Sequence, residues 1–305
     1  MSSSQGFFRA NQKAVLFCAF ALFLACASEA QLSVSPLMVD ELTVYPGGLE
    51  IVKLGVGSQS EEVQQCQVAI SGMTMAEGGL PVPADDAPRS CQDWLSIEPQ
   101  EFTLEPKKGV SLTCRVRAPR NAVGGYYGVI SVTAAGSSVT SLAEEDGVAA
   151  GVRFRHRNLV PVLITVPGPG MEAIIESAPP MLVTHPGSPG YSLELPLRNT
   201  GNMHARIHGT AQVETESGET VERFDIQAGS GFLLPANERL FTSKGSVNLI
   251  DGIYLAHIKL ELENTRRPME ATFPFYIEDG KARGGEVTPE LRERLAMKSL
   301  GFIIS

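Results

Sequence analysis

Apolar and polar residues alternate along most of the chain after residue 31, in short runs that Gly, Pro, Asn and Asp interrupt about every 8–14 positions. In the clearest run, Val110–Arg117, apolar residues occupy the even positions and polar residues occupy the odd positions. Such alternation places one face of a β-strand in a core and the other in solvent. Helical periodicity is nearly absent up to residue 279. The pattern predicts an all-β protein built from immunoglobulin-like β-sandwiches.

The strand pattern occurs twice, which predicts two similar domains in tandem instead of one large fold. The correspondence joins the Pro-Gly turns at 46–47 and 186–187, the runs 49–56 and 192–198 that follow them, and the Gly-x-Tyr sequences at 125–127 and 252–254. We expect strands in the first unit at 33–39, 49–56, 63–71, 110–117, 128–134, 152–157 and 159–166. In the second unit we expect them at 172–177, 192–198, 205–213, 222–226, 239–242, 254–262 and 270–277.

These strands group into a first immunoglobulin-like domain at 31–168 and a second at 169–279. The sequence Pro167-Gly168-Pro169-Gly170 joins them, and a linker this short and stiff restricts the angle between the domains. The C-terminal tail, 280–305, contains a short helix that Thr288 caps, with Pro289 at its first position. For the apolar end Phe302–Ile304, docking on its own domain or contact with another protein both remain open.

The N-terminus resembles a secretion signal. Arg9 and Lys13 precede an uninterrupted apolar stretch of 14 residues, 14–27, and the small residues of Ser28-Glu29-Ala30 follow it. Fourteen residues are too few for a membrane-spanning helix, which needs about 20. We predict a signal peptide at 1–30 and a periplasmic or extracellular mature protein. The alternative is lipoprotein processing at Cys26.

The charge balance excludes some classes of partner. The full chain has a formal net charge of −9, and removing residues 1–30 takes away Arg9, Lys13 and Glu29, which leaves −10. An acidic protein repels nucleic acid and anionic membrane surfaces, so neither is an expected general partner. After residue 30 no apolar stretch approaches membrane length, so we expect no integral membrane segment in the mature chain.

Three cysteines follow the signal: Cys66, Cys91 and Cys114. An oxidising compartment permits a disulfide, and the odd count leaves one thiol over. Alternation points Cys66 and Cys114 inward, and Cys91 closes the Pro- and Asp-rich segment 76–91. We therefore favour a Cys66–Cys91 disulfide, which would close that segment, with Cys114 as a buried thiol. Three unpaired cysteines are the alternative.

No catalytic or metal-binding constellation stands out. His204 and His208 have a ligand-like spacing, but they fall in a strand with Arg206 between them, which disfavours a cation. The acidic groups 85–86 and 144–146 lie in loops and fit solvated charges. Tyr127 and Tyr254 each follow a Gly before a strand and fit the tyrosine-corner device, in which the hydroxyl bonds back to the backbone. We predict no enzyme activity, no metal site and no cofactor.

Two features are candidates for partner binding. Arg153, Arg155 and Arg157 share one face of a strand, and an anion would offset their mutual repulsion. That anion is either the acidic group at 144–146 or a carboxylate from a partner. Trp94, the single tryptophan, follows the 76–91 segment and is either a core residue or an exposed anchor.

The order of these features resembles immunoglobulin-like units of bacterial extracytoplasmic proteins. The sequence 153–157 running into 160–164 is similar to the last strand of the first domain in periplasmic pilus-assembly chaperones, which also carry two such domains behind a signal peptide. WxL-associated surface proteins share weaker cues. The chaperone resemblance implies that this strand donates alternating apolar side chains to a subunit. The residues concerned would be Val152, Phe154, Val160, Val162 and Ile164.

One departure from the chaperone pattern matters. The first strand of those chaperones carries a basic residue that anchors the subunit carboxylate, and Ser33–Val39 contains none. The sequence therefore predicts a non-catalytic extracytoplasmic protein-binding module, chaperone-like in pilus assembly, whose partner is another envelope or surface protein. The alternative is a structural or adhesion component of a cell-surface complex that uses the 76–91 segment as its contact.

Overall fold

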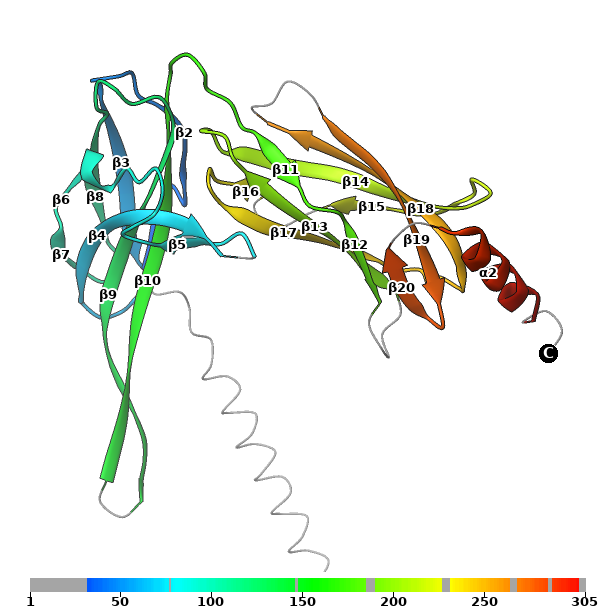
Figure 1. Cartoon of the computed structure of the whole chain (residues 1–305). Helices are drawn as coiled ribbons and strands as arrows, with labels where there is room; N and C mark the ends of the chain where they lie inside the picture. Colours follow the sequence, from blue (N-terminus) through cyan, green and yellow to red (C-terminus); the bar gives the residue numbers. More distant parts are fainter. Residues whose placement is uncertain are drawn as a thin grey trace, which may run out of the picture.

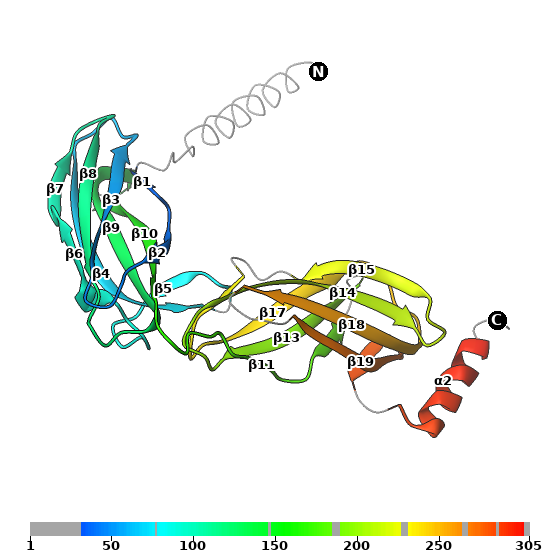
Figure 2. The same ribbon diagram turned by 90° about the horizontal axis from the view of Figure 1, so that it is seen from above.

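The computed structural model describes residues 32–76, 78–145, 148–184, 190–226, 231–263, 268–284 and 287–301, with the backbone alone at 41, 136–145, 148–154 and 296–301. These residues form two β-sandwiches in tandem, arranged as a bent molecule (Figures 1 and 2). The predicted fold class, all-β with two immunoglobulin-like sandwiches and a short C-terminal helix, is confirmed. The signal peptide predicted at 1–30 lies outside the described residues, and so does Phe302–Ile304.

The N-terminal sandwich packs a four-stranded sheet against a six-stranded one. The first has the order β1 (Leu32–Ser35), β3 (Leu49–Ser58), β8 (Gly109–Arg117) and β6 (Leu95–Glu98). The second has the order β2 (Val39–Thr43), β10 (Val148–Val166), β9 (Gly124–Glu145), β4 (Gln64–Met75) and β5 (Pro81–Pro83), with β7 (Glu101–Leu104) also paired to β4. A 3₁₀ turn, η1 (Gln92–Trp94), precedes β6.

The C-terminal sandwich has the same two-layer plan. In its first sheet β13 (Tyr191–Asn199) pairs with β11 (Ile175–Ser177), β12 (Met181–Thr184) and β17 (Glu238–Gly245). Its second sheet has the order β15 (Thr220–Ile226), β14 (Ala205–Thr215), β18 (Gly252–Leu262), β19 (Met269–Glu278) and β20 (Lys281–Gly284), with β16 (Phe232–Leu233) paired to β14.

The cores follow the alternation in the sequence. In β8 the even-numbered side chains Leu112, Cys114 and Val116 are at most 2% exposed, whereas the odd-numbered ones face outward. The internal repeat corresponds to equivalent strands: β3 and β13 follow the two Pro-Gly sequences, and β9 and β18 begin at the two Gly-x-Tyr sequences. The duplication inferred from sequence therefore describes two similar sandwiches.

Two strand predictions needed correction. The run 33–39 is two strands in different sheets, because β1 pairs with β3 and β2 pairs with β10. Pro36 stands between them and has no N–H to continue a ladder. The runs 152–157 and 159–166 are instead one strand, β10, since Asn158 continues the pairing with β9 without a break.

The predicted Cys66–Cys91 disulfide is wrong, and Cys66, Cys91 and Cys114 are all free and buried. Cys66 pairs with Ala134, whereas the sulfur of Cys91 lies against Gly128, six residues further along the same strand. Six residues of strand span about 20 Å, far beyond the roughly 7 Å between Cα atoms that a disulfide permits. Burial raises the pKa of all three thiols, that of Cys114 to about 11.

The C-terminal helix α2 (Pro289–Gly301) docks against the C-terminal sandwich at β18. The hydroxyl of Thr288 accepts a hydrogen bond from the backbone N–H of Leu291, as the predicted cap requires. Leu291 and Leu295 are 8% and 3% exposed, so their narrow apolar stripe is covered. Ion pairs from Arg292 to Glu216 and from Arg294 to Glu278 join the helix to the sandwich.

Candidate partner-binding strand edge

The β9–β10 hairpin is the longest element of the protein and projects well beyond the body of the N-terminal sandwich (Figure 1). β10 pairs with β9 from Val148 to Val166 on one side. On its other side, among the described residues, it pairs with β2 alone, and only from Val162 to Thr165. Within the part of the chain that the structure describes, the edge of β10 from residue 148 to residue 161 is therefore open.

The direction of each backbone group on this edge follows from the pairing. The carbonyl of Thr165 accepts a hydrogen bond from the N–H of Val44, so Thr165 faces away from β9. Tyr127 of β9 lies opposite Leu163. Its N–H donates to the carbonyl of Arg89 and its carbonyl accepts from the N–H of Cys91, so both groups point away from β10. Since alternate residues of a strand face the same edge, the backbone groups of Arg155, Arg157 and Leu159 point to the open side.

Pro161 is also odd-numbered and so faces the same side as Arg155, Arg157 and Leu159. The N–H that proline lacks is tolerated there because the pairing of β10 with β2 begins only at Val162. The register between β9 and β10 is unbroken from Arg155 to Val166. A register shift does occur between Arg153 and Arg155, where the three residues 136–138 of β9 lie opposite the single residue Phe154 of β10. The open edge thus has an ordered base, 155–159, and continues past this bulge into the projecting part of the hairpin.

Three of the five predicted apolar donors are core residues instead. Val160, Val162 and Ile164 are at most 1% exposed and belong to the core of their own sandwich, so they are unavailable to a partner in this state. The core ends at Asn158, whose side chain donates a hydrogen bond to the carbonyl of Leu32. For Val152, Arg153 and Phe154 the described part is the backbone, in β10, and their role stays a prediction.

Arg155 and Arg157 are exposed next to this edge. Arg157 donates a hydrogen bond to the hydroxyl of Ser131, at 2.9 Å. Among the described side chains no carboxylate pairs with either arginine. The backbone of Glu144 and Glu145 lies several residues along the hairpin from these arginines, since Glu145 pairs with Val148 while Arg155 pairs with Ala135, and Asp146 is outside the described residues. Of the two anions expected from the sequence, the geometry disfavours the local one.

Trp94 is half-buried and packs against the core of the N-terminal sandwich. Its ring centroid lies 4.2 Å from that of Tyr126, and the guanidinium of Arg89 lies 4.5 Å from the Tyr126 ring on β9. Of the two roles expected for Trp94, this packing matches that of a core residue at the end of a sheet.

The 76–91 segment contacts the C-terminal sandwich. Its hairpin, β4–β5, reaches towards β16 and β17 (Figures 1 and 2). A Cβ added to Gly79 would collide with the guanidinium of Arg239, which is 2% exposed. On the same hairpin the hydroxyl of Thr74 lies 2.9 Å from the side-chain oxygen of Asn237. The segment that the alternative function needed as an external contact is thus used within the chain.

Tyr127 also joins the sandwiches. Its side chain is fully buried, and its hydroxyl accepts a hydrogen bond from the backbone N–H of His204, at 2.8 Å. The corner prediction is therefore wrong for Tyr127, but it holds for Tyr254, whose hydroxyl bonds to the carbonyl of Ile250. His204 packs between the rings of Tyr127 and Phe232. Burial, and then the charge of Arg206, lower the pKa of His204 to about 4.

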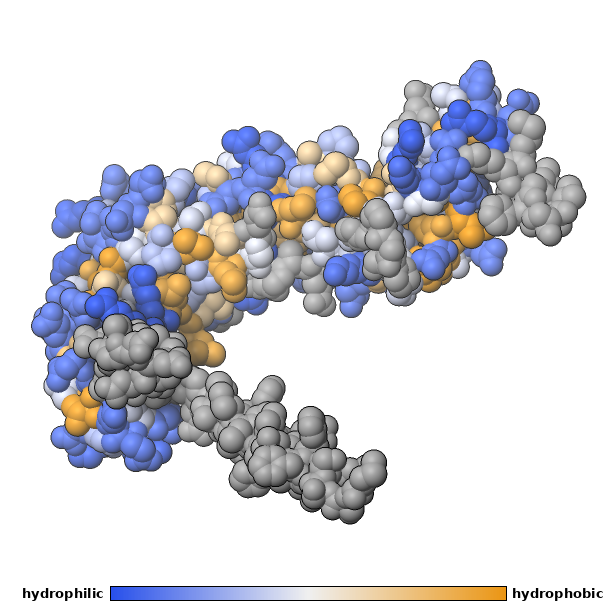
Figure 3. Space-filling view, turned by 90° about the horizontal axis from the view of Figure 1, so that it is seen from below, coloured by the Kyte–Doolittle hydropathy of each residue, from blue (hydrophilic) through white to orange (hydrophobic). Residues whose placement is uncertain are grey.

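An apolar cluster completes the junction: Met73, Tyr127, Val129 and Leu163 from the first sandwich with Phe232 and Leu234 from the second. Figure 3 shows apolar surface near the bend, with hydrophilic surface over much of the rest of that face. Arg206 lies 3.7 Å from Asp40 and over the ring of Phe232. β2 and β10 therefore rest directly against the C-terminal sandwich, which sequence patterns within one domain do not reveal.

The expected solvent-facing pair His204 and His208 is not such a pair. His204 is in the junction, and the exposed His208 lies 3.0 Å from Glu261. The part of the chain that the structure describes holds no group of three or more His, Cys, Asp or Glu side chains able to share a metal ion. In the same residues, no helix has the length and apolar character needed to cross a bilayer.

No family model matches the sequence, and no curated protein matches it. Similar solved structures include the YadV chaperone, which is 10% identical; the match covers 80% of this chain and 99% of that chain, with a TM-score of 0.40. A Salmonella enterica SafA pilin–SafB chaperone complex is 12% identical, with 79% of this chain and 95% of that chain covered and a TM-score of 0.40. The class 5 fimbriae chaperone CfaA is 14% identical, with 79% of this chain and 98% of that chain covered and a TM-score of 0.38. The solved structures to which this chain is similar are thus chaperones, alone or with a pilin.

Proposed function

We propose that this chain is a non-catalytic extracytoplasmic protein that binds an extended segment of another envelope protein along the open edge of β10. The observation that carries the proposal is the unpaired run of backbone groups at Arg155, Arg157 and Leu159. Unpaired N–H and C=O groups on a strand edge are a template for one more strand. A chaperone-like role in pilus or fimbrial assembly is the specific form of this activity that the sequence resemblance supports.

The position of the edge supports this role. The edge lies where the closed core ends at Asn158 and the hairpin leaves the sandwich, so an incoming strand meets ordered backbone on one side. Arg155 and Arg157 add positive charge to this region of an acidic protein. A segment with a carboxylate near the edge would form charge-assisted hydrogen bonds there. Val152 and Phe154, beyond the bulge, are the apolar side chains that remain candidates for contact with it.

Site-specific photo-crosslinking tests the proposal. A photoreactive amino acid is placed at position 155 and, in a matched control, at the exposed Arg115 on the outer face of the other sheet. The full chain is expressed in its own cells and irradiated. We expect a protein adduct from position 155 that position 115 does not give. The same adducts from both positions, or none from position 155, would overturn it.

A pulse-chase version of the same experiment separates the two roles considered for the protein. A chaperone releases its client, so the yield of crosslink to newly made partner falls during the chase. A structural component of a surface complex keeps its partner, so the yield stays constant.

A further inference from the structure

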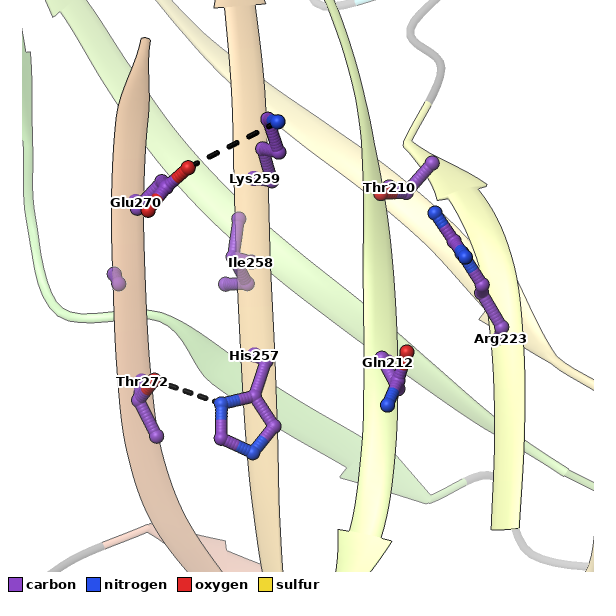
Figure 4. Close-up of a pocket in the computed structure, with 9 residues that line it drawn as sticks. Thr210, Gln212, Arg223, His257, Ile258, Lys259, Glu270 and Thr272 are labelled. Atoms are coloured by element: carbon purple, nitrogen blue, oxygen red, sulfur yellow. Dashed lines mark hydrogen bonds and ion pairs between the residues drawn. The ribbon is translucent and has the colours of Figure 1, made fainter. Parts of the chain in front are cut away.

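A polar hollow of about 340 Å³ lies on the C-terminal sandwich, far along the chain from the β10 edge (Figure 4). Strands β15, β14, β18 and β19 form its floor, and the side chains come from two rows across this sheet. One row runs through Arg223, Gln212, His257 and Thr272, and the next through Thr210, Lys259 and Glu270. Its lining contains no Phe, Tyr or Trp, and the one ring in it is the imidazole of His257.

Two cations of the hollow are available for a ligand. Arg223 has no carboxylate partner among the described residues. Among these same residues the one carboxylate near Lys259 is that of Glu270, at 3.9 Å, the outer limit of an ion pair. Figure 4 shows Thr210 between the strands that carry these two cations, with the guanidinium of Arg223 directed towards it. A guanidinium, an ammonium and a hydroxyl facing one space are donors suited to an oxyanion.

The other row is held in place by hydrogen bonds. Nδ1 of His257 lies within hydrogen-bond distance, 2.8 Å, of the hydroxyl of Thr272, and Nε2 lies 3.3 Å from a carboxylate oxygen of Glu214 without forming a hydrogen bond. The side-chain amide of Gln212 donates to Glu214, at 2.6 Å, which leaves its carbonyl oxygen as an acceptor. Glu270 is a further acceptor. These oxygens suit ligand hydroxyl groups, and the volume is in the lower part of the range for small-molecule sites.

We propose that this hollow binds a sugar acid, a hydroxylated carboxylate the size of one monosaccharide. Arg223 and Lys259 bind the carboxylate, with Thr210 as a further donor. Gln212 and Glu270 accept hydrogen bonds from the hydroxyl groups. Because no Phe, Tyr or Trp lines the hollow, a neutral sugar would find no large ring to stack on, so charge provides most of the selectivity. This site is independent of the strand edge proposed above.

Isothermal titration calorimetry of the full mature chain with D-glucuronate tests the proposal. D-glucose is the uncharged control, and acetate and inorganic phosphate are controls for an anion alone. We expect saturable binding of glucuronate, with every control weaker by about tenfold or more, since a hydrogen bond to a charged group contributes roughly that factor. No saturable glucuronate binding would overturn the proposal, and so would equal binding of glucose, acetate or phosphate.

The variants Arg223→Gln and Lys244→Gln locate the site. Both remove one positive charge from the C-terminal sandwich, but Lys244 is an exposed residue of β17, in the opposite sheet. We expect Arg223→Gln to weaken glucuronate binding about tenfold to a hundredfold and Lys244→Gln to leave it unchanged. Equal affinities in the two variants would show that binding is elsewhere. Unchanged thermal unfolding in both variants confirms that the comparison concerns binding.

Discussion

Proline substitutions in β10 should distinguish its two edges. The N–H of His156 points to β9 and that of Arg157 points to the open side, because the odd-numbered residues of β10, such as Thr165, face away from β9. Proline at 156 removes a ladder hydrogen bond and places its ring against the partner strand. Proline at 157 removes an N–H that has no partner strand, as Pro161 already does in the natural chain.

The expected magnitudes differ several-fold. His156→Pro should lower the free energy of unfolding by about 3 kcal/mol or more relative to His156→Ala. Arg157→Pro should differ by less than about 1 kcal/mol from Arg157→Ala, because no ladder bond is lost. The alanine references remove the side-chain terms, including the hydrogen bond from Arg157 to Ser131. Domains are stable by only about 5–15 kcal/mol, so a 3 kcal/mol loss is readily measured.

The assay is urea unfolding followed by tryptophan fluorescence. Trp94 is the single tryptophan and packs on Tyr126 of β9, so its signal reports on the N-terminal sandwich. Each ΔG comes from the midpoint and slope of the transition. A destabilisation by Arg157→Pro as large as that by His156→Pro would refute the assigned parity and the open edge with it.

Three further predictions concern the junction and the helix. The pKa of His204 is lowered from 6.5 to about 4, so between these two pH values the unfolded chain binds the proton before the folded chain does. The free energy of unfolding should therefore fall by about 3 kcal/mol as the pH drops through this window. Urea midpoints measured against pH should show this slope in the wild type and lose it in His204→Asn. Gly79→Ala, at φ +76° and against Arg239, should displace the β4–β5 hairpin and cost about 1–3 kcal/mol, while Gly78→Ala, which meets nothing within 4 Å, should be neutral in the same assay. Leu295→Ala removes a 3%-exposed side chain, so α2 should undock and limited proteolysis within 287–301 should accelerate, whereas equal cleavage rates would contradict the docking.

The fold could be predicted from sequence because the signals that specify it are local. Strict alternation in 110–117 marks a half-buried strand wherever it occurs, and the repeated Pro-Gly and Gly-x-Tyr sequences mark equivalent strands in both sandwiches. The Thr288 cap and the Leu291–Leu295 stripe likewise depend on neighbours within one helical turn.

The site could be predicted only in part. The sequence indicates 152–164 as a candidate binding strand, but alternation alone does not show where the core ends. It therefore predicts partner contacts for Val160, Val162 and Ile164, which their own sandwich covers. The junction was missed because its contacts join residues more than 70 positions apart, as in Tyr127 with His204 and Thr74 with Asn237. The same applies to Cys91, whose position depends on how 76–91 folds back onto β9.

Residue-resolved amide hydrogen exchange tests the central claim most directly, in the free protein and in complex with the partner that crosslinking identifies. In the free protein the amides of Arg155, Arg157 and Leu159 should exchange fast, whereas those of His156, Asn158 and Val160 should be protected by β9. Partner binding should slow the three fast amides by about tenfold or more, because each gains a ladder hydrogen bond. Amides at 155, 157 and 159 that exchange equally fast in the complex would contradict binding along this edge.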